Sequence, residues 1–282
     1  MKFLSNLLFI SFSIIILYSC AGKLTQDVID TRTTHFTLHS QLVKDSFDVY
    51  VSLPEGYENS DKRFHTIYYM DANLKSGKAM REAVLNNRQK NNPINAICVG
   101  IGHFENYREL RRRDLITPFV KSGNDSLISN EVNFGHCEEF YLLLKQELIP
   151  QIEAQYRCNT DRSFVGHSLG GLFAFYCLFK KEHLFRNHVA LSPALWINYY
   201  NIYDFEKKYY EYSHTLDATL YLCTGTKETF NKILEGGRAM KDTLGKRNYA
   251  NLVFNYKEFQ DDTHNSEVPK ALEMILPKLA SK

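Results

Sequence analysis

The chain has 282 residues, 44% of them hydrophobic, and a formal net charge of +2. This is enough apolar material for one large core, and α/β proteins of this size often fold as a single domain. The nearly balanced charge gives no sign of the concentrated basic face with which proteins bind nucleic acid. The short basic cluster at residues 111–113 is typical of a solvated charged turn.

The N-terminal residues have the pattern of an export signal. Lys2 precedes an uncharged apolar run that ends at Ser19 and Cys20, and the run is shorter than the roughly 20 residues of a membrane-spanning helix. Its end, "LYSC" followed by "AG", resembles a bacterial lipobox, in which the signal is removed before a cysteine that then carries lipid. We expect a signal peptide over 1–19, a lipidated Cys20 and a tether over 20–32. The protein would then be an exported lipoprotein, anchored in the periplasm or outer membrane of a bacterium. In the alternative, an ordinary signal peptide, Cys20 has no role.

From residue 33 to residue 282, β-type apolar runs alternate with helical runs, and we expect one domain over this range. The predicted strands are 47–54, 65–71, 95–102, 162–168, 188–196, 219–228 and 251–259, and the predicted helices are 137–156, 169–181, 230–246 and 267–279. Pro150 is expected to bend the first helix or to end its first part. Because the middle strands are continuously apolar, we predict an α/β fold, a largely parallel sheet with helices on both faces.

Five cysteines follow Cys20, so an exported chain could form disulfides but must leave at least one thiol free. Three of them, Cys98, Cys177 and Cys223, lie in apolar runs and are expected in the core. Cys137 and Cys158 flank a long helix, whose ends are too far apart for a bridge. We therefore expect no disulfide, and the Cys and His spacing indicates no metal site.

The stretch "FVGHSLGGLFAFY" places a serine on a predicted sharp turn. Gly166-x-Ser168-x-Gly170 lies between a predicted strand and a predicted buried helix, the context of a nucleophile elbow. Glycines two residues on either side allow the strand and helix to approach closely. We predict that Ser168 is a catalytic nucleophile.

A serine nucleophile requires a base, which in this fold follows the serine and the acid in the chain. His264 lies in the loop after the last predicted strand, at the carboxyl edge of the sheet where catalytic groups gather. His183 and His188 are too close to the elbow in sequence and are expected at the surface, and His214 precedes a strand. We therefore predict His264 as the base.

The acid that orients His264 is expected to be Glu228, which comes directly after the apolar run "TLYLCTG" of the strand before the histidine loop. Asp261 and Asp262 are alternatives in the histidine's own loop, and a dyad without an acid is another. For the oxyanion hole, two backbone N–H donors are needed; Leu169 directly after the nucleophile is one.

The whole order of motifs is similar to the putative-esterase family of α/β-hydrolases. The segments that carry the resemblance are "VSLPEGY", "IYYMDAN", "RRRDLITP", "EFYLLLKQELIPQIEAQYR", "FVGHSLGGLFAFY", "LSPALW", "GTKE" and "DDTHNSEVP". This family includes ferric-enterobactin and salmochelin esterases, S-formylglutathione hydrolase and feruloyl esterases. Two of the segments, "LSPALW" and "RRRDLITP", favour the siderophore-esterase branch.

The resemblance implies the same nucleophile and base, with oxyanion donors at Leu169 and at Asn73, which follows the predicted strand 65–71. It also implies that Arg113 and Asp114 lie at the edge of the site and that Trp196 forms part of the pocket wall. We expect Asp71, Arg113 and Trp196 to contact substrate. Relatives usually have glycine where Ala72 stands, so its methyl group could alter the oxyanion loop.

Three functions stay open. The first is a serine carboxylic-ester hydrolase that needs no cofactor and acts on siderophore-like or other small polyol or catechol esters. The second is an acyl or feruloyl esterase on glycans. The third is a non-catalytic binding lipoprotein, which an intact Ser, acid and His set disfavours. The oligomeric state is left open.

Overall fold

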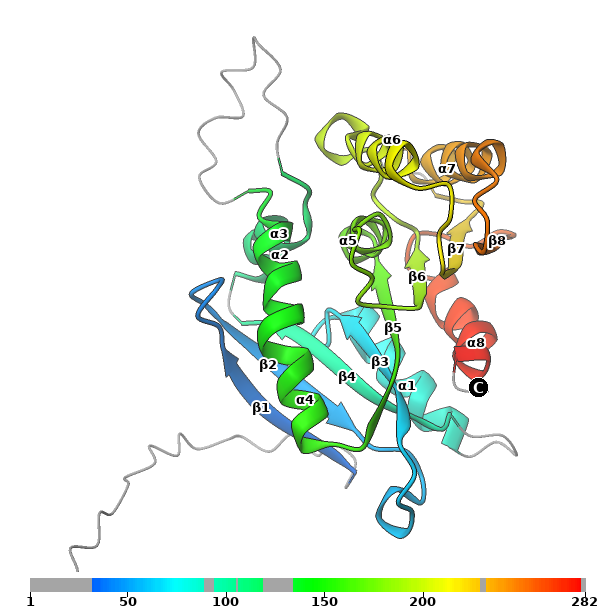
Figure 1. Cartoon of the computed structure of the whole chain (residues 1–282). Coiled ribbons are helices and arrows are strands. Elements are labelled where there is room, and N and C mark those ends of the chain that lie inside the picture. The colour runs from blue at the N-terminus through cyan, green and yellow to red at the C-terminus, as the bar shows by residue number, and fades with distance from the viewer. Residues whose placement is uncertain (1–31, 89–93, 105, 119–133, 229–231, 280–282) are drawn as a thin grey trace, which may run out of the picture.

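The computed structural model describes residues 32–88, 94–104, 106–118, 134–228 and 232–279. These residues form an eight-stranded sheet with the strand order β1-β2-β4-β3-β5-β6-β7-β8 (Figure 1). The strands are β1 Thr33–His39, β2 Ser46–Ser52, β3 Phe64–Met70, β4 Ala96–His103, β5 Cys158–His167, β6 Asn187–Leu191, β7 Thr219–Gly225 and β8 Val253–Phe259. Both pairings of β2, with β1 and with β4, are antiparallel, and all the others are parallel. The predicted α/β fold with a mostly parallel sheet is therefore confirmed.

Helices cover both faces of the sheet. The helices are α1 Lys75–Arg88, α2 Tyr107–Leu115, α3 Cys137–Leu143, α4 Ile149–Gln155, α5 Leu169–Leu178, α6 Ile202–Tyr212, α7 Ile233–Arg247 and α8 Glu267–Leu279, with short 3₁₀ turns at Tyr57–Asn59 and Ile197–Tyr200. In Figure 1, α1 and α8 lie together, while α5 lies on the other side of the sheet beneath α6, and α7 lies beside α6 above β7.

Two apolar clusters correspond to these two faces. Along β3, Ile67 and Tyr69 pack into the cluster shared with α1 and α8, whereas Tyr68 and Met70 pack into the larger cluster shared with α3, α4 and α5. This alternation follows from the two-residue period of a strand. Because both faces are covered, β3 is buried along its whole length, and four consecutive residues of it, 67–70, are apolar.

The predicted helix 137–156 is present but its hydrogen-bond register changes on the way. A π-helical turn, Leu144–Leu148, separates α3 from α4, and Pro150 lies at the start of α4. Proline has no N–H and its ring collides with the carbonyl four residues earlier, so a wider turn just before it relieves the collision. Pro150 divides the helix, as expected.

Strand β1 and helices α1, α2 and α6 are not among the predicted elements. The expectation of a solvated turn at residues 111–113 is wrong, because these residues lie in α2. The error has a physical reason: most of α2 is charged, and only Asp114 and Leu115 in it are buried, so the segment has no apolar stripe. The prediction that His188 lies at the surface is also wrong, because this side chain is fully buried in β6.

All five cysteines within the described ranges are buried and have free thiols. No described helix is long and apolar enough to cross a membrane. The predicted signal peptide, the lipidated Cys20 and all but the last residue of the predicted tether lie outside the described residues.

Candidate active site

Ser168 occupies a sharp turn between β5 and α5. Its backbone has φ 58° and ψ −113°, a conformation that a residue with a side chain adopts at a cost of about 1–3 kcal/mol. The turn is held from both sides, since Ser168 N–H donates to Leu191 O at 2.9 Å and Ser168 O accepts from Ala194 N–H at 3.0 Å. A Cβ at Gly166 would lie 2.0 Å from Gly170 O. Glycine at 166 therefore permits the strand and the helix to meet, as the motif predicts.

His264 and Glu228 are hydrogen-bonded to each other, with 3.1 Å between Nδ1 and Oε2. The Glu228 side chain is fully buried. Burial alone would raise its pKa, but hydrogen bonds from His264, from Ser192 and from the Gly225 backbone N–H outweigh burial and hold the pKa of Glu228 below its ordinary value. An ionised carboxylate only accepts, so Nδ1 of His264 carries the proton and Nε2 keeps its lone pair.

The two alternative acids have other partners. Asp262 accepts from Lys270 Nζ at 2.7 Å and from Ser266 Oγ at 2.8 Å. Asp261 pairs with Lys227 at 3.1 Å. The geometry therefore favours Glu228 as the acid partner of the histidine.

The loop that carries His264 is held against the sheet by two contacts. A Cβ at Gly225, the last residue of β7, would lie 2.2 Å from Asp262 O, so only glycine allows this approach. His167 Nε2 donates to the carbonyl oxygen of His264 at 2.6 Å, and the two rings lie 4.5 Å apart. Burial, with the nearby His264, lowers the pKa of His167 to about 3, so its ring stays neutral. His167 lies between the glycine and serine of the motif, but sequence reasoning assigned it no role.

A cavity of about 300 Å³ opens at the elbow. It is lined by Leu74, Ser76, Tyr107, Arg111, His167, Ser168, His264 and Asn265. The serine and the histidine therefore face one space, although they are 96 positions apart in the sequence. The described residues contain no cluster of three metal-ligating side chains.

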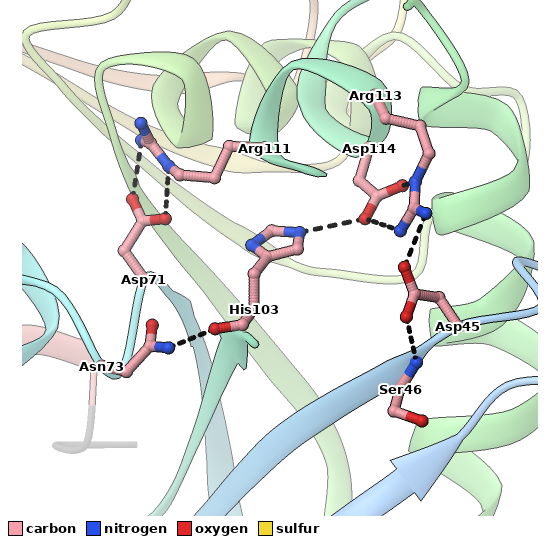
Figure 2. A network of polar contacts seen from close by, with 8 residues as sticks. All are labelled: Asp45, Ser46, Asp71, Asn73, His103, Arg111, Arg113 and Asp114. Carbon is pink, nitrogen blue, oxygen red and sulfur yellow. Dashed lines mark hydrogen bonds and ion pairs between the residues drawn. The ribbon is translucent and has the colours of Figure 1, made fainter. Parts of the chain in front are cut away.

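The two predicted oxyanion donors lie beside this cavity. Leu169 is the first residue of α5, where an N–H has no acceptor within the helix. Asn73 follows β3 by three residues, and its side-chain amide donates to His103 O (Figure 2). The methyl group of Ala72 is fully buried in the core and faces Gly100, where a Cβ would lie 2.8 Å from it. This substitution for glycine is therefore accommodated by the sheet.

The three residues predicted to contact substrate lie outside the lining of the cavity. Asp71 is 1% exposed, and both its oxygens are bound by Arg111, at 2.6 Å and 2.8 Å. Arg113 points the other way, toward Asp114 and Asp45 (Figure 2). Trp196 is half-buried and has no hydrogen-bond partner for Nε1 among the described residues. The basic residue that reaches the cavity is Arg111, two positions before the one predicted.

Two arginine side chains of α2 point in different directions, Arg111 toward Asp71 and Arg113 toward Asp114 and Asp45 (Figure 2). His103 Nε2 contacts Asp114 Oδ2 at 2.9 Å, and both side chains are buried. Arg113 donates to both oxygens of Asp114 and to Asp45 Oδ2 at 2.7 Å. These contacts attach α2 to the ends of β3 and β4, so that Arg111 is held at the rim of the cavity.

We predict that Asp71→Asn lowers the free energy of unfolding by about 1–3 kcal/mol, because it leaves the half-buried Arg111 at the cavity rim without its counter-charge. Arg111→Gln is expected to be similarly destabilising, and the double variant should be less destabilised than the sum of both. Urea unfolding measures these changes, with Arg108→Gln on the exposed side of α2 as a control for loss of positive charge. Additive losses would contradict a direct coupling.

Comparison with known proteins finds relatives of the chain among esterases. The family described as "Putative esterase" matches residues 40–267. The ferri-bacillibactin esterase BesA of Bacillus subtilis is 34% identical over 140 residues, 47% of this chain and 48% of that protein. A siderophore enterobactin esterase of Emericella nidulans is 28% identical over 156 residues, 51% of this chain and 50% of that protein. The matched part thus spans about half the length of each of these relatives.

Solved structures share the fold over nearly the whole chain. The BES protein of Bacillus cereus superposes with a TM-score of 0.77 at 24% identity, over 92% of this chain and 99% of that one. An IroE-like serine hydrolase of Shewanella oneidensis gives the same TM-score at 23% identity, over 88% of this chain and 80% of that one. With its family match extending over most of the described sheet, the protein belongs to this esterase family and has the α/β-hydrolase fold.

Proposed function

We propose that the protein is a serine carboxylic-ester hydrolase in which Ser168 is the nucleophile, His264 the base and Glu228 the acid. The observation that carries the proposal is the strained Ser168 in a cavity that it shares with His264, whose ring is oriented by the buried Glu228. The backbone conformation of Ser168, with φ 58°, is energetically unfavourable, and such strain is typical of a nucleophile on a sharp turn.

In the first half of the reaction, Ser168 Oγ attacks the ester carbonyl carbon and its proton passes to His264 Nε2. The ionised Glu228 stabilises the resulting imidazolium through the Nδ1 hydrogen bond. The negative charge that develops on the carbonyl oxygen would be held by the N–H groups of Leu169 and Asn73.

In the second half, the C–O bond to the leaving alcohol breaks, and His264 gives the alcohol its proton. The acyl group stays on Ser168 Oγ as an ester. A water molecule then attacks this acyl-enzyme, again losing a proton to His264. Collapse of the second tetrahedral intermediate releases the carboxylic acid and returns the proton to Ser168.

For the substrate, we propose a siderophore-like or other small catechol or polyol ester. The support is the identity of two relatives that are named as siderophore esterases, together with the cavity's mixed lining, which includes the cation Arg111 and the half-exposed ring of Tyr107. A guanidinium and an aromatic ring both suit electron-rich catechols. The protein would act outside the cytoplasm as a lipoprotein anchored through Cys20, a proposal that rests on the lipobox-like "LYSC".

The test uses the full-length protein in detergent, a fluorophosphonate probe and p-nitrophenyl butyrate. We expect hydrolysis of the ester, loss of that activity on labelling, and a single modified peptide that contains Ser168. A cyclic catechol-serine triester and a feruloyl sugar ester then separate the siderophore substrate from a glycan substrate by their kcat/KM. A folded protein that neither labels nor hydrolyses any of the three esters would overturn the proposed activity and leave a binding protein on a hydrolase scaffold.

A further inference from the structure

A second buried carboxyl group lies behind the acid of the site. Glu267 is the first residue of α8, and its side chain is fully buried. Its Oε1 lies 2.9 Å from Ser192 Oγ. The same hydroxyl also contacts Glu228 Oε1. One serine hydroxyl thus bridges two carboxyl groups, and one of them, Glu228, is hydrogen-bonded to His264.

The number of protons in this bridge is limited. A serine hydroxyl has one hydrogen, so it donates to one carboxyl group and accepts at its oxygen from the other. Glu228 already accepts a hydrogen bond from His264 Nδ1, and this bond favours the ionised form of Glu228 over that of Glu267. The proton that completes the bridge therefore belongs on Glu267, whose second oxygen is buried and has no partner among the described residues. If Glu267 were ionised, its unpartnered oxygen would lose the hydration of its charge and gain no hydrogen bond in exchange, which is strongly unfavourable.

The charges around Glu267 agree with this assignment. Glu228 and Asp262 are negative, Cys223 contributes a buried thiol from β7, and the nearby cation Lys270 is bound to Asp262. Burial, and then the two neighbouring carboxylates, raise the pKa of Glu267 to about 8 against the single opposing contact with Ser192. The group is therefore mostly protonated at pH 7.

Ser192 is fixed in the orientation that the bridge needs. It follows β6, its N–H donates to Cys223 O at 2.7 Å, and its φ is 40°. The strained backbone is held by Pro193, which packs against Gly171 of α5. Ser168 also has a positive φ, so a second strained serine lies in contact with Glu228, the proposed acid.

We propose that Glu267 is a positioning residue of the esterase site, a protonated carboxyl group that donates to Ser192 Oγ and so commits the serine's only proton to Glu228. The proposal rests on the proposed function of Glu228. The resulting chain runs from Glu267 O–H to Ser192 O–H to Glu228, which then accepts from His264. It fixes the Glu228 carboxylate without adding a negative charge beside it.

Activity measurements separate this role from a purely structural one. Glu267→Leu removes the donor and is expected to lower kcat by about 10- to 100-fold with little change in KM, the loss typical of one hydrogen bond to a charged group. Glu267→Gln supplies an N–H donor and should restore most of kcat at pH 7. Wild-type kcat should also decline with an alkaline transition near pH 8, because the ionised Glu267 repels Glu228, and this transition should be missing in Glu267→Gln.

Stability gives a second readout with a defined sign. The raised pKa means that the folded protein holds a proton between about pH 4.5 and pH 8 that the unfolded chain releases. The stabilising contribution is therefore complete below about pH 4.5 and is lost as the pH rises through about 8. The Tm of Glu267→Gln relative to wild type should rise across that window. Glu235→Gln, on the exposed side of α7, is the matched control and should follow wild type at every pH.

A direct test does not need activity. Infrared difference spectra of the folded full-length protein should show a protonated carboxyl band at pH 7 that Glu267→Gln removes and Glu235→Gln retains. If the band is absent from wild type, or if Glu267→Gln is as impaired as Glu267→Leu while still folded, the proposal is overturned. If wild type proves inactive on every ester, the proposed function fails, and the infrared band still decides the protonation of Glu267.

Discussion

Ser168→Ala and His264→Ala are each expected to lower kcat for p-nitrophenyl butyrate by about 10⁵- to 10⁶-fold, and the double variant should lose no more than either single one. The reason is that the two residues act as one unit. Without the base, the hydroxyl stays protonated, and without the hydroxyl, the base has no proton to take. Steady-state kinetics with each variant at the same pH gives the comparison.

Two controls separate this result from a change in the fold. His214→Ala removes an exposed histidine that stacks on Tyr210, and its kcat should equal that of wild type. Labelling by the fluorophosphonate should vanish in Ser168→Ala and slow greatly in His264→Ala. If the losses of the two single variants instead multiply in the double variant, the residues act independently and the shared mechanism is wrong.

The parts of the site that could be predicted are those that follow directly from strand ends. Ser168, Glu228 and His264 each follow a strand that is recognisable by its apolar run, and the carboxyl ends of parallel strands meet at one edge. Glycines that permit close approach, such as Gly166, also lie in the sequence motif. Chain order and residue type are sufficient there, because the topology of a parallel sheet brings the loops that follow its strands to one edge.

Other parts depend on tertiary contacts that leave no local pattern. Helix α2 is highly charged. Its arginines are directed by two buried carboxylates, Asp71, which follows β3, and Asp114, which lies in α2 itself and contacts His103 at the end of β4. For this reason the sequence pointed to Arg113, and the structure brings Arg111 to the cavity. Glu267 begins the last helix, where an acidic residue is common because of the helix dipole. What the sequence does not show is that α8 packs against Ser192, which buries the Glu267 carboxyl group and brings it into contact with the serine hydroxyl.

Glu228→Gln is expected to lower kcat by about 10³- to 10⁴-fold with little change in KM, the magnitude typical of replacing a triad acid by its amide. The amide cannot stabilise the imidazolium of His264. Its NH₂ group also favours the wrong tautomer of the ring, with the proton on Nε2, where the lone pair is needed. Rates of ester hydrolysis and of fluorophosphonate labelling should fall together, because both require the same activated serine.

The size of this loss decides between a triad and a dyad. Glu235→Gln controls for the loss of one negative charge and should leave kcat unchanged. A folded Glu228→Gln that keeps kcat within about tenfold of wild type would mean that Ser168 and His264 suffice, since most of the effect of a triad acid is then absent. Asp262 is a poor substitute in that case, because Lys270 and Ser266 already bind its carboxylate.

In a dyad, the His264 ring would be oriented chiefly by its loop, which the hydrogen bond from His167 Nε2 to the His264 carbonyl oxygen holds in place. His167→Phe removes this hydrogen bond. It should therefore reduce kcat more in Glu228→Gln than in wild type.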